Sequence, residues 1–380
     1  MFVFYKKLVL NTREKDLGYY SFCGIIKRRK YTMISYHLLK VLILAGISFF
    51  VALAATPVLT NLLLKFKVGK NIRNDGSTPV YSQMHAGKQG TPTMAGILVW
   101  GTTCFLIALF WFLDRVLHIE YFHILNFLTR KETLLPVGAL FGASMIGLFD
   151  DYLDWRGRGY KNRGIRFRYK LIFYALVAAV GAYWFYFKLG FDYLSVPFFG
   201  NVSIGWIYIP FFILAAVGTS FSVNQTDGLD GLAGGTLLTS FLAYGLIAYL
   251  EGRYELAAFI AVISGALLAF LWFNIFPAMF FMGDTGSMGL GTVLAVIAFL
   301  VHGELVLPII GIVFVIEALS LFGQIFWRKV FKRKLLLSAP LHHHLEASGW
   351  PEAKVTMRLW IVSMIFAMLG VIIHFVGTKS

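Results

Sequence analysis

Ten apolar runs of roughly 20 residues dominate the chain, and a run of this length crosses the hydrocarbon core of a bilayer as an α-helix. Hydrophobic residues make up 58% of the 380 residues and charged residues only 14%, below the share of a typical soluble domain. We therefore predict an all-α polytopic membrane protein with ten transmembrane helices. The runs lie near residues 38–64, 92–113, 132–150, 171–189, 204–223, 232–250, 256–276, 285–301, 305–326 and 359–377.

The loop charges predict how these helices are oriented. Most Lys and Arg residues between the runs follow the first, third and ninth runs. Because cytoplasmic loops carry an excess of Lys and Arg, the loops after the odd-numbered runs are predicted to be cytoplasmic. The same rule explains the formal net charge of +15, so no nucleic-acid partner is predicted.

The first 32 residues do not fit this orientation. They contain eight Lys and Arg residues, which resist transfer across a membrane. We expect the natural start to be Met33, which leaves residues 1–32 as a basic extension and residues 33–380 as the ten-helix domain. Cys23 and Cys104 lie in different regions, and neither a disulfide framework nor a cysteine metal site is predicted.

Carboxylate and amide side chains gather at the predicted cytoplasmic ends of the helices, where the motifs are "GLFDDY", "NQTDGLDGLAGG" and "FNIFPAMFFMGDTGS". They are Asp150, Asp151, Asn224, Asp227, Asp230, Asn274 and Asp284. Each motif alone has a structural interpretation as a helix end, a turn or an N-cap, and Glu317 inside the ninth run can be a hydrogen-bonded structural acid. Together, on one face and among glycines, they predict an active site on the cytoplasmic face.

Oxygen donors of this kind suit Mg²⁺, a hard cation that keeps water and substrate phosphates in its shell. A neighbouring loop rich in Gly, Thr, Lys and His, "HAGKQGTPTMAG", suits a diphosphate, because its backbone N–H groups can approach closely.

Three consecutive histidines, His342 to His344, lie in "APLHHHLEASGW". Successive residues on a helix project about 100° apart, so three in a row cannot all face one ion. In an extended loop they could instead donate hydrogen bonds to phosphate oxygens. We favour phosphate and nucleotide contact over metal binding.

With these motifs, residues 33 to the C-terminus resemble the phospho-N-acetylmuramoyl-pentapeptide transferases (the MraY family) of the polyprenyl-phosphate N-acetylhexosamine-1-phosphate transferase superfamily. "DDY" and "DGLDGLA" are similar to the superfamily signatures, and "GTPTM" and "APLHHH" narrow the resemblance to this family.

The resemblance implies a Mg²⁺-dependent reaction of peptidoglycan synthesis. UDP-N-acetylmuramoyl-pentapeptide and undecaprenyl phosphate would give lipid I and UMP at the cytoplasmic face of the bacterial inner membrane. A homodimer is expected from the resemblance alone. One direct displacement and a route through an aspartyl-phosphate both stay open.

The resemblance also implies roles for individual residues. Asp150, Asp151 and Asp284 are the expected catalytic residues, with Asp284 and Asp227 as metal ligands and Asp150 as the candidate base. The expected substrate-binding residues are Lys88, Thr93, Asn224, Asp227, Asp230, Asn274, Phe281, Ser287, Gln324, His342, His343 and His344. Phe281 would stack on the uracil.

One position departs from the family pattern. Asp154 stands where family members often carry Lys, and Arg156, Arg158 and Lys170 are candidates to restore that charge.

Two other functions stay open as alternatives. An N-acetylglucosamine-1-phosphate transferase would share the Mg²⁺ chemistry but not "APLHHH". A transporter would carry acids near the middle of the membrane, whereas only Glu317 is predicted to lie deep.

Overall fold

The structure is a computed structural model that describes residues 22–69, 88–129, 132–159 and 164–377. The chain divides into two compact units, Met1–Lys40 and Val41–Ser380. The described part of the first unit is helical from Phe22, where helix α2 begins. Residues 1–21 lie outside the described residues. The start at Met33 stays a prediction.

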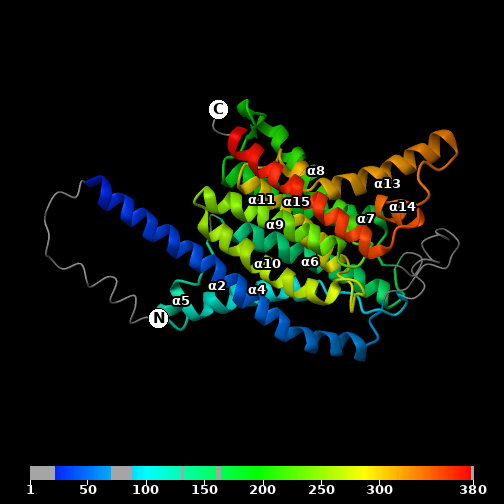
Figure 1. Cartoon of the computed structure of the whole chain (residues 1–380), viewed down its shortest axis with the longest axis horizontal. Coiled ribbons are helices and arrows are strands. Elements are labelled where there is room, and N and C mark those ends of the chain that lie inside the picture. Colours follow the sequence, from blue (N-terminus) through cyan, green and yellow to red (C-terminus); the bar gives the residue numbers. More distant parts are fainter. Residues whose placement is uncertain (1–21, 70–87, 130–131, 160–163, 378–380) are drawn as a thin grey trace. The chain divides into compact units, whose positions relative to one another are not determined.

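Helices account for most of the second unit (Figure 1). The long ones are α2 (Phe22–Lys65, shared with the first unit), α4 (Ile97–Arg115), α6 (Leu134–Trp155), α7 (Phe167–Tyr183), α8 (Tyr208–Thr226), α9 (Leu232–Leu250), α10 (Tyr254–Asn274), α11 (Asp284–Leu300), α13 (Ile312–Phe331) and α15 (Glu352–Gly377). The short ones are α5 (Glu120–His123), α12 (Leu307–Ile310), α14 (Leu341–Ala347), the π-helix η3 (Trp184–Lys188) and the 3₁₀ helix η4 (Gly205–Ile207). Strands β1 (Tyr193–Val196) and β2 (Gly200–Ser203) form an antiparallel hairpin in which Tyr193 pairs with Ser203.

Eight of the described helices are long and apolar enough to cross a membrane. They are α2, α4, α6, α7 with η3, α8 with η4, α9, α10 and α15. Helix α11 is apolar but has 17 residues, and the predicted run 305–326 is divided at Gly311 into α12 and α13. The chain is therefore a multi-pass membrane protein by length and composition, and the number ten stays a prediction.

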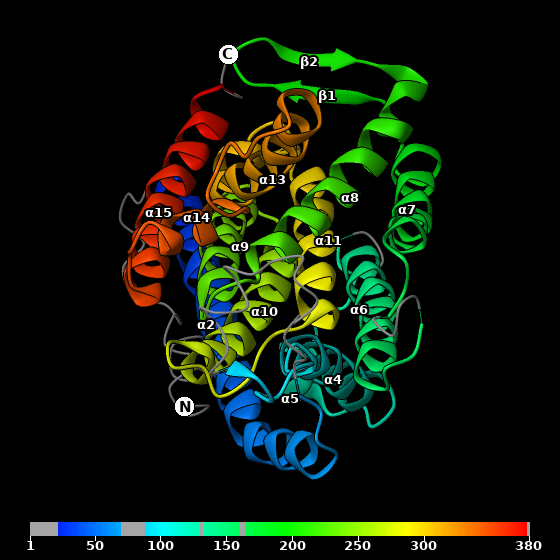
Figure 2. The ribbon, with the colours of Figure 1, turned by 90° about the vertical axis from the view of Figure 1, so that its right-hand side faces the viewer.

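Helix α11 lies at the centre of the packing, and every residue from Thr285 to Leu300 is buried. It packs along α6 and α8, while α9 packs against α10 and α15. Small residues allow this close approach, because a Cβ at Gly291 would lie 2.8 Å from the Cα of Ser220 on α8. Figure 2 shows α11 between α8 and α6, with the β1–β2 hairpin near the N-terminal end of α8.

The segment before α4 is not helical, although the run 92–113 predicts a helix from its first residue. Pro92 pairs with Gly69 in an isolated bridge, and the N–H groups of Ala95 and Gly96 bond to the carbonyl oxygens of Phe281 and Met282. This segment therefore lies beside the beginning of α11, where the predicted site residues converge.

Candidate active site

The carboxylate of Asp151 connects the end of α6 to the start of α11. One of its oxygens accepts a hydrogen bond from the backbone N–H of Asp284 at 3.1 Å, and the other from the N–H of Thr285 at 2.9 Å. The first N–H groups of a helix have no partner inside the helix, and Gly283 before α11 provides no side-chain cap. Asp151 therefore caps α11 from a neighbouring helix, a role that the sequence did not predict.

Two glycines allow this junction. A Cβ at Gly147 of α6 would collide with the carbonyl oxygen of Asp284. Gly283 has a φ of +74°, in the left-handed region that favours glycine, and a Cβ there would lie 2.6 Å from an Asp151 oxygen. The local sequence around "GDTGS" thus serves the close approach of α6 to α11.

Lys170, in the first turn of α7, lies between two of the predicted catalytic acids. Its Nζ is 2.5 Å from Oδ2 of Asp150 and also contacts Oδ2 of Asp284. The other Asp150 oxygen accepts the N–H of Ile165 at 2.5 Å. Two adjacent carboxylates disfavour each other's charged form, so the ammonium group stabilises both as anions.

Asn224, near the end of α8, completes this corner. Its Nδ2 donates to Oδ1 of Asp284 at 2.7 Å and to Oγ of Ser287 at 3.0 Å. We call the group Asp150, Asp151, Lys170, Asn224, Asp284 and Ser287 the acidic corner. Five of its six members were predicted as site residues, and helices α6, α7, α8 and α11 bring them together.

The donor set of the acidic corner fits a divalent cation. Carboxylate oxygens of Asp150 and Asp284 already surround one cation, the ammonium group of Lys170, and Mg²⁺ prefers oxygen donors of this kind. The Asp284 side chain is 21% exposed, so a ligand can reach it from solvent. Among the described residues, no three His, Cys, Asp or Glu side chains already form a metal-ligand cluster, and Mg²⁺ binding stays a prediction.

Asp227 is the C-cap of α8, three residues after Asn224. It begins the turn of residues 227–231, which joins α8 to α9 and which we call the 227–231 turn. Its backbone N–H bonds to the carbonyl oxygens of Val223 and Asn224 at the end of α8. Its proposed contact with metal is not tested.

A second charged group lies at the other end of the 227–231 turn. Lys88 Nζ is 2.6 Å from Oδ1 of Asp230 and also contacts Oε1 of Glu352 in α15. The backbone N–H of Asp230 donates to Glu352 at 2.8 Å, and that of Ala278 donates to Oδ2 of Asp230 at 2.9 Å. Lys88 and Asp230 were predicted, whereas Glu352 was not.

Asn274 and Phe281 lie close to this second group. The buried Asn274 amide accepts the N–H of Gly231 at 3.1 Å and donates to the carbonyl oxygen of Phe280 at 2.8 Å, so it ties two loops together. The Phe281 ring lies 5.8 Å from Lys88 Nζ. Its predicted contact with uracil is not tested, but the residue is only half-buried.

Thr93 lies beside the start of α11, because its Oγ1 is 3.2 Å from the position of a Cβ on Gly283. Its backbone N–H donates to the carbonyl oxygen of Val68 at 3.1 Å.

The three histidines lie on the short helix α14, so the alternative of an extended loop is wrong. His342 Nδ1 pairs with Glu317 at 2.9 Å, His343 Nδ1 pairs with Glu346 at 2.9 Å, and His344 Nδ1 accepts the N–H of Leu337 at 3.2 Å. The different partners follow from the 100° spacing of successive helical residues. The fully buried ring of His342 faces Gly228.

Gln324 of α13 is used within the protein. Its Oε1 accepts the N–H groups of Leu335 and Leu336 at 2.9 Å each, and its Nε2 donates to the carbonyl oxygen of Leu336 at 3.2 Å. The side chain thus holds the loop before α14 against α13. Its predicted contact with the nucleoside is not tested by this geometry.

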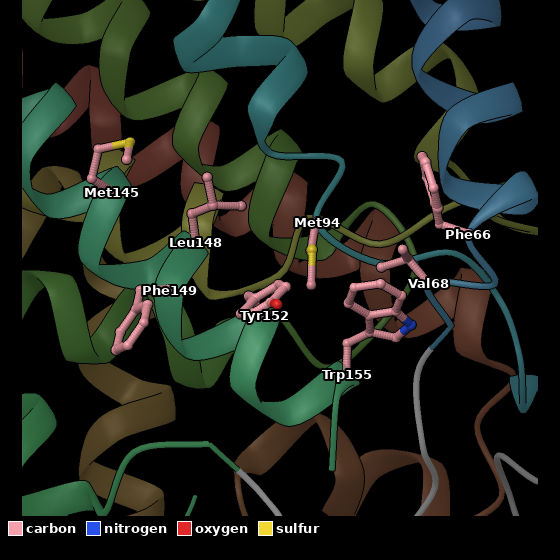
Figure 3. A pocket seen from close by; sticks show the side chains of 8 residues that line it. All are labelled: Phe66, Val68, Met94, Met145, Leu148, Phe149, Tyr152 and Trp155. Atoms are coloured by element: carbon pink, nitrogen blue, oxygen red, sulfur yellow. The ribbon is translucent and has the colours of Figure 1, made fainter. Parts of the chain in front are cut away.

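An apolar pocket of about 360 Å³ lies on another face of the α6 end (Figure 3). Its lining residues are Phe66, Val68, Met94, Met145, Leu148, Phe149, Tyr152 and Trp155. Figure 3 shows Met94 and Tyr152 facing each other across its centre. Tyr152 directly follows Asp151, so the pocket and the acidic corner share this end of α6.

Two functional residues were weakly signalled by the sequence. Lys170 was considered only as a replacement for the charge absent at Asp154, and it lies 19 residues beyond Asp151. Glu352 follows the histidines by eight residues and lies just beyond the "APLHHHLEASGW" stretch. Only the packing of α7 and α15 brings these side chains to the site.

Comparisons with known proteins agree in one direction. Residues 133–302 match the family model described as Glycosyl transferase family 4. A phospho-N-acetylmuramoyl-pentapeptide-transferase of Chloroflexus aggregans is 38% identical over 345 residues, covering 87% of this chain and 89% of the relative. Proteins of the same name from Thermodesulfovibrio yellowstonii and Geobacillus kaustophilus are each 36% identical, covering 86% and 88% of this chain and 90% and 98% of their own lengths.

Proposed function

Because the chain belongs to the phospho-N-acetylmuramoyl-pentapeptide-transferase family, we propose that it transfers phospho-N-acetylmuramoyl-pentapeptide from its UDP conjugate to undecaprenyl phosphate. The products would be lipid I and UMP. The observation that carries this proposal is the acidic corner, where Lys170 bridges Asp150 and Asp284 and Asn224 holds the second Asp284 oxygen.

The reaction joins two anions, so its main requirements are positioning and charge neutralisation. An oxygen of the lipid phosphate attacks the phosphorus that carries the sugar, a new P–O bond forms, and the P–O bond to UMP breaks. A Mg²⁺ ion held by Asp284 and Asp227 would supply positive charge at the diphosphate. Oδ2 of Asp150 is the candidate base for the lipid phosphate, and Lys170 keeps that carboxylate anionic and oriented.

The nucleotide half of the substrate is assigned to the second charged group. Lys88 is held by Asp230 and Glu352, and its side chain is 20% exposed beside the half-buried Phe281. A cation suits a phosphate, and an aromatic face suits a flat base. This arrangement supports diphosphate contact by Lys88 and stacking of uracil on Phe281.

The lipid half is assigned to the apolar pocket on α6 (Figure 3). An isoprenoid chain gains free energy by leaving water for such a surface, and the pocket shares the end of α6 with Asp151. Replacing Leu148 by Trp, which fills the pocket, is expected to raise the KM for undecaprenyl phosphate and to leave the KM for the nucleotide unchanged. An unchanged KM for undecaprenyl phosphate would mean that the isoprenoid chain binds elsewhere.

The acidic corner is assigned to the cytoplasmic face of the bacterial inner membrane, because its nucleotide substrate is cytosolic and the Lys and Arg residues favour that side. Cysteine accessibility scanning in inverted and intact vesicles tests this orientation. A homodimer is also expected, and the mass of the detergent-solubilised protein by light scattering tests it.

The first experiment compares UMP release from UDP-N-acetylmuramoyl-pentapeptide and from UDP-N-acetylglucosamine, each with undecaprenyl phosphate and Mg²⁺. Turnover of the muramoyl substrate alone, lost with EDTA, is the expected result. Turnover of the glucosamine substrate alone would keep the phosphoryl chemistry and change the pathway. Absence of turnover with both, from folded protein, would contradict the proposal.

A further inference from the structure

Glu317, in the second turn of α13, is a fully buried carboxylate that the proposed reaction does not use. Its Oε2 is 2.9 Å from Nδ1 of His342 and 3.3 Å from the backbone nitrogen of the same residue. Both side chains have an exposed fraction of 0%. A buried carboxylate is costly unless it is paired, so this position needs His342 as its partner.

The pair is incompletely satisfied. Among the described residues, Glu317 Oε1 and His342 Nε2 are both buried and have no hydrogen-bond partner. Buried polar atoms in proteins are nearly always hydrogen-bonded, and each exception calls for an explanation. A pair that only held α14 against α13 would not need two buried atoms without a hydrogen-bond partner.

The unpartnered nitrogen of His342 lies against the 227–231 turn. A Cβ added to Gly228 would collide with Nε2 of His342. The φ of Gly228 is outside the left-handed region, so the imidazole, and not the backbone conformation, requires glycine at this position. The ring therefore supports the turn between Asp227 and Asp230 from behind.

We propose that Glu317 is a positioning residue for nucleotide binding, an inference that rests on the proposed function. A carboxylate only accepts hydrogen bonds when ionised, so Glu317 selects the form of His342 with hydrogen on Nδ1 and turns Nε2 toward the 227–231 turn. That turn connects Asn224, which binds Asp284, with Asp230, which binds Lys88. Its position thus sets the distance between the acidic corner and the nucleotide group, so a nucleotide that binds at the turn changes the surroundings of Nε2 through Gly228.

The kinetic test uses Glu317→Leu, which removes the acceptor at similar volume, and Glu317→Gln, which keeps the shape if the first variant does not fold. Ser320→Ala is the matched control, because Ser320 binds the N–H of Leu341 at 2.8 Å on the same α13–α14 contact without touching the imidazole. The KM for the nucleotide is expected to rise about ten-fold, because the variant loses one hydrogen bond to a charged group. The lipid KM and the control are expected to stay unchanged.

The spectroscopic test follows the ¹⁵N shifts of labelled histidines, with His342 assigned by its absence in His342→Gln. Wild-type protein is expected to show hydrogen on Nδ1 of His342 and a shift of Nε2 on addition of UMP, whereas Glu317→Gln is expected to show a mixture of tautomers. A fixed tautomer in Glu317→Gln, or kinetic losses shared equally with Ser320→Ala, would overturn the proposal. Failure of the proposed function is a separate outcome, because wild-type protein would then neither release UMP from the muramoyl substrate nor respond to UMP.

Discussion

An acid lies at or just beyond each end of α11, and the two acids have opposite surroundings. Asp284 is the first residue of the helix, where the helix dipole favours an anion, and Lys170 and Asn224 bind its side chain. Glu304 lies four residues beyond the last one, is 5% exposed, and receives only the N–H of Ser195 at 3.2 Å on one oxygen among the described residues. Burial raises the pKa of Glu304 to about 7.

The difference teaches which acids can act on a charged substrate. An acid with a lysine beside it and a helix N-terminus below it stays anionic when buried. An acid at the carbonyl end of a helix, with no described cation bonded to it, takes up a proton near neutral pH instead. The same helix, about 25 Å long at 1.5 Å per residue, therefore separates an anionic corner from a neutral one.

The largest effect is expected from Asp284→Asn. It removes the anion that Lys170 and the proposed Mg²⁺ share, and a loss of turnover of about a thousand-fold or more is expected. The fold is expected to stay intact, because Asp151 caps the backbone N–H of residue 284 and not its side chain. UMP release and circular dichroism measure the two properties, with the exposed Asp192→Asn as the control. Turnover close to that of wild type would contradict the catalytic assignment.

Lys170→Leu tests the contribution of the cation to this comparison. It leaves Asp150 and Asp284 close together without a described counter-charge. Turnover is expected to fall about a hundred-fold and the free energy of unfolding by about 3 kcal/mol, the scale for one lost partner of a buried pair. Adding Asp150→Asn is expected to restore stability but not activity, since it removes the repulsion only. The control is Arg168→Leu, which removes the same positive charge from an exposed position on α7. Equal free energies of unfolding for the two Leu variants would refute the pairing of Lys170 with the acids.

Asp151→Ala tests the cap at the start of α11. Loss of two backbone hydrogen bonds at a helix N-terminus is expected to lower the free energy of unfolding by about 1–2 kcal/mol. Hydrogen exchange of the first α11 amides should rise with it. Faster exchange at the far end of α11, and not at its start, would show that the carboxylate acts elsewhere.

Glu304→Gln sharpens the comparison from the opposite end of α11. The folded pKa of about 7 is above the ordinary value of 4.5, so the folded state binds more protons between these values. The free energy of unfolding then decreases as the pH rises from about 4.5 to about 7. Glu304→Gln is expected to remove this decrease, measured as melting temperatures of the solubilised protein at pH 5 and pH 8. An identical slope in the variant would mean that Glu304 is already charged at neutral pH.

Individual residues show how far the sequence alone reached. Asp150, Asp284, Asn224 and Ser287 were predicted from their motifs, and the structure brings them together. Asp151 was expected as a catalytic residue, and its function as a helix cap depends on the close packing of α6 on α11. Asn274 and Gln324 were expected to bind substrate, which stays a prediction. In the structure their amides bind loop backbone, because a buried amide needs a partner wherever the chain provides one.

The sequence by itself determined the membrane class, the positions of the apolar helices and the set of acids from which the site is built. Length of an apolar run and the type of a side chain are local properties, and the bilayer and Mg²⁺ chemistry act on them directly. Only the tertiary structure decided which side chain meets which acid: Lys170 with Asp150 and Asp284, Lys88 with Asp230 and Glu352, and His342 with Glu317. Those pairings arise between residues 20 to 264 positions apart, because helix packing, and not sequence spacing, brings the two partners close together.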